Sequence, residues 1–370
     1  MKEVPLILDA WKRALDAGDE AVLATVVRIA GSSYRKPGAR MLITSDGRNI
    51  GTVSGGCLER HLVERAWWLT EEGAVLCRFD TRADEDAQWS FGLGCNGEVH
   101  VLLERVGAHH AREAFDALCA VRETMRPAAT AVVIAADAGG GAQVGERLLL
   151  MPDGTLASRV EDPALADRMA AMLREDGRWP RYRRLACGAG SVEVACERMM
   201  PPQRLVVFGA GHDAVPLVSF AKALGWHVSV ADARAQYARR ARFPAADRVT
   251  SMGPDTTLEQ CGVTPQAAVV VMTHSIEQDR ALLARLLATP RSYVGQLGPM
   301  ERTERMLCEI RDAGGAPLYT DGLHYPVGLD IGADNPEEIA LAIVAEIRAH
   351  FAGRAEAATG SVRRARTVAS

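Results

Sequence analysis

The sequence lacks any apolar run long enough to cross a membrane. Its 370 residues contain no stretch near the roughly 18 consecutive apolar positions that a spanning helix needs. Charged residues interrupt the apolar positions of residues 1–23, which is typical of an amphipathic helix and not of a signal peptide. We therefore expect a cytoplasmic protein without a membrane partner.

An excess of one charge is also missing. Lys and Arg together number 43 and Asp and Glu 47, which gives a formal net charge of −4. Attraction to nucleic acid or to an anionic membrane depends on a strongly basic surface. The charge balance therefore predicts no nucleic-acid partner.

The eight cysteines lack the spacing of a metal site or of a disulfide scaffold. No two of them form a C-x-x-C pair, and the histidines form neither H-E-x-x-H nor a pair separated by three to five residues. We therefore expect no zinc or iron–sulfur site. The cysteines are expected to be reduced thiols, most of them small buried core residues.

The length and the 48% of hydrophobic residues predict about two globular domains. We expect an N-terminal domain over residues 1–200 and a second domain over residues 203–350. The Ala-, Gly- and Arg-rich residues 352–370 are expected to form a disordered basic tail.

Strands alternate with helices in the second domain. Short apolar or β-branched runs occupy residues 204–208, 227–231, 267–272 and 292–297, with helical patterns between them. This alternation predicts a parallel, doubly wound α/β sheet. Asn335 followed by proline and two glutamates predicts the start of a last helix.

The N-terminal domain contains an internal repeat. Residues 24–27 align with 131–134, and 40–47 with 147–154, at one offset of 107 residues (131 − 24 and 153 − 46). A closing segment aligns at an offset of 93 (197 − 104). We interpret this as a duplication, with copies at about residues 20–106 and 127–199, each a strand, an Asp-Gly hairpin, a strand, a helix and a closing strand. The alternative is chance similarity between two hairpins. The predicted fold class is thus a Rossmann-like sheet preceded by an α+β domain.

Features that only the first copy has are candidates for function. They are the basic loop Gly31–Gly38, the segment Ser54–Cys57, and a longer loop that ends at Cys95. The second copy has short, featureless connections at the equivalent places. Two cysteines and one basic loop therefore stand out from the repeat.

Cys57 lies between a predicted strand and a predicted helix over residues 58–69, after Ser54, Gly55 and Gly56. Glycines permit close backbone approach, and the first N–H groups of a helix attract anions and favour a thiolate. A thiolate binds soft metals or carries sulfur. The alternative is a buried thiol in a tight turn, with Glu59 as an ordinary acid at the helix start.

Cys95 and two basic residues extend this candidate site. Cys95 is flanked by glycines, which leaves its thiol uncovered, although a simple glycine-rich turn would have the same composition. Arg35 and Lys36 lie in a glycine-bounded loop that suits phosphate binding. A solvated hairpin tip is the alternative for these two residues.

A second candidate site lies in the Rossmann-like domain. Gly209-x-Gly211-x-x-Ala214 follows a predicted strand and opens a helix, and Asp232 comes 21 residues after Gly211 (232 − 211). This spacing suits a helix N-terminus that binds phosphate and an acid that binds a ribose hydroxyl. Any phosphate ligand meets the same helix, so the pattern alone does not specify a nicotinamide. His274 falls where open α/β sheets bind ligands, or is a loop histidine with a local partner.

Together these motifs resemble the XdhC/CoxI family, whose members mature xanthine dehydrogenase, aldehyde oxidoreductase and carbon monoxide dehydrogenase. The resemblance rests on Gly31–Gly38, Ser54–Glu59, Gly92–Cys95, Phe208–His212, Met272–His274, Tyr293–Gly295 and Pro326–Gly332, in this order along the chain.

The resemblance implies a chaperone rather than an enzyme. Such a protein binds the molybdenum cofactor, in its mononucleotide or dinucleotide form, supports its sulfuration with a cysteine desulfurase, and inserts it into an apo-molybdenum hydroxylase. Cys57 and Cys95 would contact the molybdenum, and Gly209, Gly211, His212, Asp232 and His274 would hold the phosphate or dinucleotide end. Direct participation in sulfur transfer and a homodimer are both left open.

Two other functions are compatible with parts of the sequence. The glycine pattern with Asp232 also fits an NAD(P)-dependent oxidoreductase, although no acid–base set for hydride transfer accompanies it. Residues 30–40 loosely resemble the phosphate loop of a nucleotidyltransferase, but that loop should lead into a helix and here a strand is predicted.

Overall fold

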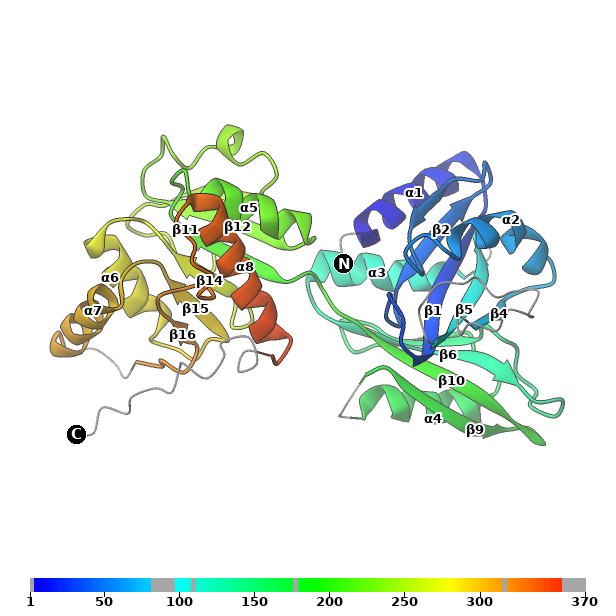
Figure 1. Ribbon diagram of the computed structural model, residues 1–370. Helices are drawn as coiled ribbons and strands as arrows, with labels where there is room; N and C mark the ends of the chain where they lie inside the picture. Colours follow the sequence, from blue (N-terminus) through cyan, green and yellow to red (C-terminus); the bar gives the residue numbers. More distant parts are fainter. Residues whose placement is uncertain (1–2, 81–96, 108–110, 176–178, 315–317, 355–370) are drawn as a thin grey trace. The chain divides into compact units, whose positions relative to one another are not determined.

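The computed structural model describes residues 3–80, 97–107, 111–175, 179–314 and 318–354. They divide into two compact units, whose boundary lies between Pro201 and Pro202. In the N-terminal unit two antiparallel sheets are combined with helices, and a single parallel sheet forms the C-terminal unit (Figure 1). Among the described residues, no helix is both long and apolar enough to span a bilayer.

The two halves of the N-terminal unit have the same order of elements. The first half consists of α1 (Glu3–Ala17), β1 (Ala21–Gly31), β2 (Arg40–Thr44), β3 (Asn49–Gly51), α2 (Glu59–Leu69), β4 (Val75–Asp80) and β5 (Gly97–Val106). The second half consists of α3 (Arg112–Thr124), β6 (Ala128–Ala136), β7 (Arg147–Leu150), β8 (Leu156–Ser158), α4 (Pro163–Arg174), β9 (Arg181–Cys187) and β10 (Gly190–Met199).

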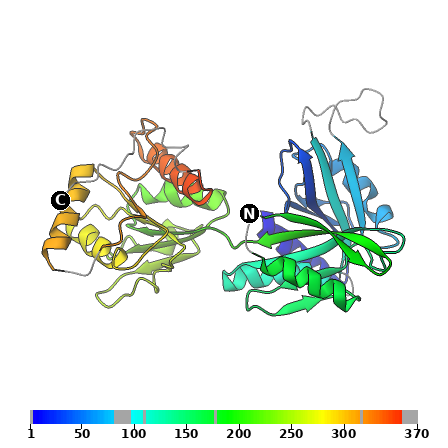
Figure 2. The ribbon, with the colours of Figure 1, turned by 90° about the horizontal axis from the view of Figure 1, so that it is seen from below.

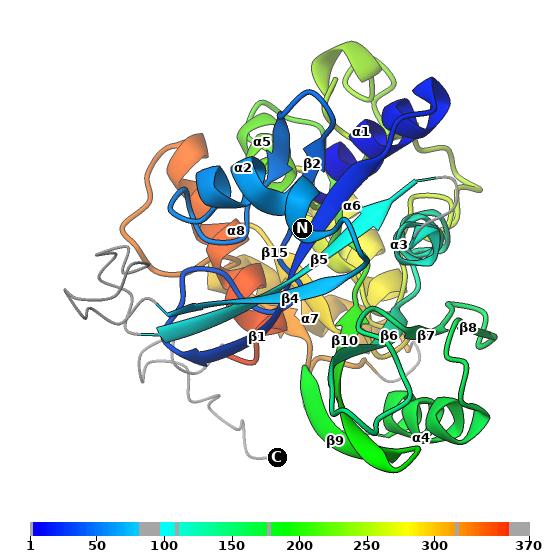
Figure 3. The ribbon, with the colours of Figure 1, turned by 90° about the vertical axis from the view of Figure 1, so that its right-hand side faces the viewer.

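Both sheets also share their strand order and an irregularity. The orders are β3-β2-β1-β5-β4 and β8-β7-β6-β10-β9. The register of β1 against β5 shifts at Val27, and that of β6 against β10 shifts at Ile134, which is the same place in the repeat. A bulge bends a strand and increases its twist, so both sheets curve at equivalent positions. Figure 3 shows the central strands of the two sheets.

The first sheet is covered on both faces because its central strand β1 begins with an apolar run, residues 21–24. Ala21 and Leu23 of β1 pack with α1 and α3, whereas Val22, Ala24 and Val26 pack with α2. Successive side chains of a strand point to opposite faces, so the apolar residues of β1 serve both cores. β1 leaves this core toward Gly31, where it becomes exposed and the candidate loop Gly31–Gly38 begins.

The two sheets meet through a small apolar cluster and two ion pairs. Val27 and Leu102 of the first sheet pack against their repeat equivalents Ile134 and Ala195, together with Val132. Beside this cluster the sheets exchange charged side chains in a reciprocal way, because each half contributes one arginine and one glutamate.

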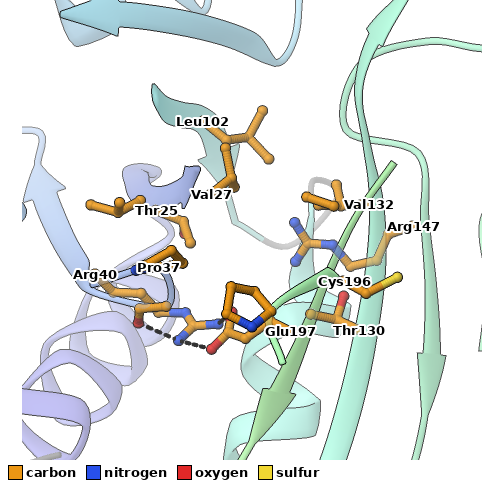
Figure 4. Close-up of a pocket in the computed structure, with 14 residues that line it drawn as sticks. Thr25, Val27, Pro37, Arg40, Leu102, Thr130, Val132, Arg147, Cys196 and Glu197 are labelled. Atoms are coloured by element: carbon orange, nitrogen blue, oxygen red, sulfur yellow. Dashed lines mark hydrogen bonds and ion pairs between the residues drawn. The ribbon is translucent and has the colours of Figure 1, made fainter. Parts of the chain in front are cut away.

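Each arginine pairs with the glutamate of the other half. Arg40 of β2 binds Glu197 of β10 through two bonds, Nη2–Oε2 at 2.7 Å and Nη1–Oε1 at 3.0 Å. Arg147 of β7 binds Glu104 of β5, Nη2–Oε2 at 2.7 Å. Arg40 and Glu104 are 5% and 2% exposed, so both pairs are shielded from water. Figure 4 shows Arg40, Glu197 and Arg147 beside the small cavity between the sheets.

The C-terminal unit is a Rossmann-type sheet. Its elements are β11 (Arg204–Phe208), α5 (Ala214–Ala223), β12 (His227–Asp232), the 3-10 turn η1 (Arg240–Arg242), β13 (Arg248–Ser251), β14 (Ala268–Val271), α6 (Ile276–Leu286), β15 (Tyr293–Gln296), α7 (Met300–Asp312), β16 (Leu323–His324) and α8 (Pro336–Phe351). All six strands are parallel, in the order β13-β12-β11-β14-β15-β16. The sheet is parallel and doubly wound, as the alternation of strands and helices predicts, and its strand order is that of the Rossmann fold.

Helices cover both faces of the parallel sheet. α5 and α8 pack on one face over Leu205 and Val207, and α6 and α7 pack on the other over Val206 and Phe208 (Figures 1 and 2). Asn335 caps α8 as expected, since its side chain accepts a hydrogen bond from the amide of Glu338 at 2.9 Å. The carboxyl ends of the strands are left to form the ligand-binding edge.

The ion pairs between the sheets yield a prediction about stability. Glu104→Ala strands a buried guanidinium, so we expect the N-terminal unit to lose about 3–5 kcal/mol of unfolding free energy. The double variant Glu104→Ala, Arg147→Ala should recover part of this loss. Urea unfolding of the full chain, followed by tryptophan fluorescence, measures the effect. Arg60→Ala is the control, because its ion pair with Glu64 is exposed and contributes about 0–1 kcal/mol. Equal effects of Glu104→Ala and Arg60→Ala would contradict the prediction.

Candidate functional site

Two of the loops that distinguish the first copy meet at one end of the first sheet. A side chain at Gly55 would lie 2.9 Å from the ring of Tyr34, so the segment Ser54–Cys57 touches the loop Gly31–Gly38. β5 begins opposite the end of β1, where Gly97 pairs with Gly31. Cys95 lies outside the described residues. The structure thus brings Tyr34 and the segment that carries Cys57 together.

The backbone amides of the Ser54–Cys57 segment bind a carboxylate of the chain itself. Glu59 Oε1 accepts hydrogen bonds from the amides of Val53 and Ser54 at 3.0 and 2.9 Å and from Gly55 at 3.2 Å. Its Oε2 accepts from the amide of Gly56 at 2.9 Å and from the Ser54 hydroxyl. Positive φ values of 121° and 122° at Gly55 and Gly56 make this wrapping of the backbone possible.

Glu59 is held in its ionised form. Burial raises the pKa of its carboxyl, but the Ser54 hydroxyl and the backbone amides outweigh burial and lower the pKa to about 2. The anion-binding role that the sequence predicts for Ser54, Gly55 and Gly56 is therefore filled by Glu59. An external phosphate would have to displace a buried, fully bonded carboxylate.

Cys57 lies directly before α2. The helix begins at Glu59 with Leu58 as its N-cap residue, and the amide of Leu58 donates to the Ser54 hydroxyl at 3.0 Å. The Cys57 side chain is half-buried against the core formed by residues such as Val53 and Leu62. Hydrogen bonds thus hold the backbone on both sides of Cys57, and the residue itself is half-buried.

The two basic residues of the loop Gly31–Gly38 have different surroundings. Arg35 forms an ion pair with Glu3 of α1, and both side chains are about a quarter exposed. Lys36 is exposed. Arg35 therefore ties the loop to α1, and Lys36 is the cation that this loop presents to solvent.

The glycine motif of the parallel sheet adopts the expected turn. A side chain at Gly209 would lie 2.3 Å from the carbonyl oxygen of Met272, so β11 and β14 approach closely where they end. Gly211 is less constrained, because a Cβ there would lie 2.5 Å from Asp213 Oδ1, the end of a side chain that can move. Gly211, His212 and His274 line one cleft of about 680 Å³ at this edge.

Asp232, the predicted ribose-binding acid, forms its hydrogen bonds with other residues of the chain. Its Oδ2 accepts from the amide of Ala210 at 2.7 Å and from Arg234 Nη2 at 2.7 Å. Its Oδ1 accepts from the amide and from Nε of Arg234 at 2.8 and 3.0 Å. Burial raises the pKa of this carboxyl, but the bonds to Arg234 and Ala210 lower it overall. Asp232 is 2% exposed and does not line the cleft.

The start of α5 also holds a carboxylate of the chain. Asp213 is its N-cap residue, accepts from the amide of Ala214 at 3.1 Å, and lies 2.8 Å from His274 Nε2. His274 has a positive φ of 64°, which is unusual for a residue with a side chain. The N-terminus of α5, where the sequence predicts a phosphate, is therefore partly occupied by the Asp213–His274 pair.

Sequence reasoning missed several residues of the cleft. Arg234, Tyr237, Asp213 and Arg302 line it beside the predicted ones. Arg234 could have been predicted as a ligand-binding residue, because it lies two residues after Asp232, the acid at the end of β12. Arg302 comes from α7, which the apolar pattern did not predict. Within the part of the chain that the structure describes, no cluster of three or more His, Cys, Asp or Glu could hold a metal ion.

The hydrogen bonds of Glu59 predict a pH-dependent stability. Its folded pKa of about 2 lies below the ordinary 4.5, so the bonds stabilise the unit fully above pH 4.5 and are lost as the pH falls toward 2. We expect Glu59→Gln to cost on the order of 3 kcal/mol of unfolding free energy at pH 7, and this difference should shrink between pH 5 and pH 2.

Urea unfolding of wild type and variant across this pH range measures the difference. Glu64→Gln on the exposed side of the same helix is the control and should leave the pH profile unchanged. A Glu59→Gln profile parallel to that of wild type would contradict the assignment.

Comparisons with known proteins agree with the two-unit architecture. Residues 14–80 match the family described as "XdhC and CoxI family", and residues 205–347 match the one described as "XdhC Rossmann domain". A solved structure from Bacillus halodurans, described as a xanthine dehydrogenase, superposes with a TM-score of 0.76 at 29% identity and covers 97% of this chain and 98% of that chain.

Two curated relatives extend over most of the sequence. The chain is 34% identical over 336 residues to a Bacillus subtilis protein described as a probable xanthine dehydrogenase subunit, and the match covers 90% of this chain and 94% of the relative. It is 25% identical over 337 residues to the "Molybdenum cofactor insertion chaperone PaoD" of Escherichia coli, which covers 90% and 84%. The chain belongs to the XdhC and CoxI family.

Proposed function

We propose that this protein is a cytoplasmic chaperone that binds the molybdenum cofactor as cargo, supports its sulfuration by a cysteine desulfurase, and inserts it into an apo-molybdenum hydroxylase of the xanthine dehydrogenase type. The coarser role, cofactor maturation, follows from family membership and from the PaoD relative. Catalytic turnover by the chain itself is not required.

The observation that carries this proposal is the rigid presentation of Cys57. Four backbone amides and one hydroxyl bind Glu59 and hold the glycine turn that precedes Cys57, and Gly55 of this turn lies against the ring of Tyr34. Thiolates are preferred ligands of soft metal centres, so the molybdenum end of the cargo would face Cys57. Cys95 is proposed to join it there.

The phosphate end of the cargo is assigned away from this loop. The amides of residues 53–56 are already bonded to Glu59, so they cannot also bind a phosphate without losing that carboxylate. Lys36 is exposed on the loop Gly31–Gly38, and in the C-terminal unit the cleft beside Gly211 and His212 remains the candidate for binding a phosphate or nucleotide.

An oxidoreductase role is less well supported by the same geometry. The acid that would bind the ribose diol, Asp232, is buried and bonded to Arg234 and Ala210. The loop at residues 30–40 leads into strand β2, not into a helix as in a nucleotidyltransferase phosphate loop. We therefore retain cofactor handling as the function.

Molybdenum content tests the proposal. In protein purified anaerobically from cells that make the cofactor, Cys57→Ala should lower bound molybdenum about tenfold or more, which is the scale of losing a contact to a metal centre. Elemental analysis per chain gives the readout. Cys308→Ala, an exposed thiol on α7, is the matched control and should retain wild-type content. If Cys57→Ala and Cys95→Ala both leave bound molybdenum unchanged, the assignment fails.

A further inference from the structure

The loop Gly31–Gly38 carries an aromatic side chain that lies outside the hydrophobic core. Tyr34 is 74% exposed, the largest exposed fraction among the large hydrophobic side chains that the structure describes. The second half of the N-terminal unit has the same strand order, and its equivalent loop, residues 139–145, contains no aromatic residue. The scaffold therefore forms without such a ring, and the Tyr34 ring is available to a ligand.

The backbone is anchored on both sides of Tyr34. A side chain at Gly97 of β5 would lie 2.1 Å from the carbonyl oxygen of Ser32, so the loop lies directly against β5 just before Tyr34. After Tyr34, the amide of Gly38 donates to the carbonyl oxygen of Val26 in β1 at 2.8 Å. These contacts with the sheet set the place of Tyr34 on the N-terminal unit.

The glycine turn before Cys57 supports one side of the Tyr34 ring. A Cβ at Gly55 would lie 2.9, 3.2 and 3.4 Å from Cδ1, Cε1 and Cγ of Tyr34, so three consecutive ring atoms lie against Gly55. A larger residue there would displace the ring and would also be strained at the Gly55 φ of 121°. Because Tyr34 is mostly exposed, the rest of its ring is open to a ligand.

An open aromatic ring with a defined position suits a flat, heteroaromatic ligand. Such a ligand gains favourable stacking on tyrosine, and tyrosine has only two side-chain torsions to order on binding. Cys57 follows Gly55 by two residues, so the turn that supports the ring also carries the thiol proposed to face molybdenum. In the molybdenum cofactor the sulfur atoms that hold the metal are carried by the pterin, so the ring next to the metal is the flat ring of the pterin.

We infer that Tyr34 is a pterin-binding residue, on whose open ring face the flat pyrimidine ring of the cargo stacks. This inference rests on the proposed function, because it takes the molybdenum cofactor as the ligand, and it adds the group that recognises the organic part of that cargo. Tyr34 orients the pterin, whereas Cys57 contacts the metal. The two residues therefore contribute separately to binding.

Binding of the oxidised pterin released from the cofactor tests this inference on the full chain without cargo. This probe keeps the flat pyrimidine ring, lacks molybdenum, and is fluorescent, so a fluorescence titration gives its affinity. Tyr34→Ala should weaken binding about tenfold, which is the scale of one lost stacking contact. Tyr34→Phe keeps the ring and should bind nearly as tightly as wild type.

Two further variants serve as controls. Trp68 of α2 is 70% exposed, so Trp68→Ala removes another exposed ring of the same unit and should leave the affinity unchanged. Cys57→Ala should also leave it unchanged, because the probe carries no metal.

The outcomes separate this inference from the proposed function, which molybdenum content tests. Equal affinities of wild type and Tyr34→Ala, or the same loss in Tyr34→Phe as in Tyr34→Ala, would overturn the inference alone. So would a wild-type protein that retains molybdenum but does not bind the pterin. A wild-type protein that neither binds the pterin nor contains molybdenum would overturn both.

Discussion

The carboxylate of Glu59 is the interaction on which the candidate site depends. It collects the amides of Val53, Ser54, Gly55 and Gly56 and thereby fixes a turn that only glycine can form at two successive positions. Without this carboxylate the four amide N–H groups would lose their shared acceptor and would need another hydrogen-bond partner. The loop is thus an anion-binding site that is occupied by a carboxylate of the chain itself. This arrangement holds the backbone next to the half-buried Cys57.

The second half of the N-terminal unit has the same fold without a carboxylate-bound glycine turn before its helix. Its helix α4 begins in the ordinary way, with Asp162 as N-cap accepting from the amide of Ala164 at 2.8 Å and a proline in the first turn. The reciprocal pairs Arg40–Glu197 and Arg147–Glu104 hold both halves in one frame. One half therefore has a plain helix start, and the other has a thiol-bearing turn at the same place.

Much of the fold could be predicted from the sequence, because it depends on local patterns. Apolar runs bounded by turn residues predicted β11, β12, β14 and β15 but not the edge strands β13 and β16, and the Asn335 cap predicted the start of α8. The partners of the charged side chains could not be predicted in the same way. Asp232 lies at the end of a strand and Cys57 lies before a helix, as the sequence predicts. Whether a carboxylate binds a ligand or the chain's own amides depends on three-dimensional contacts. Glu59 fills the anion position predicted for residues 54–56, and Arg234 takes up the Asp232 carboxylate that was predicted to bind a ribose; only the fold shows both contacts.

Hydrogen exchange of the protein with and without bound cargo tests the central claim most directly, namely that the cargo binds beside Cys57. The account predicts that cargo slows amide exchange in residues 31–38 and 54–58. Residues 138–145 and 160–163 of the second half, which share the scaffold but lack the thiol, provide an internal control and should not change. Protection confined to the second half, or no protection in residues 54–58, would contradict it.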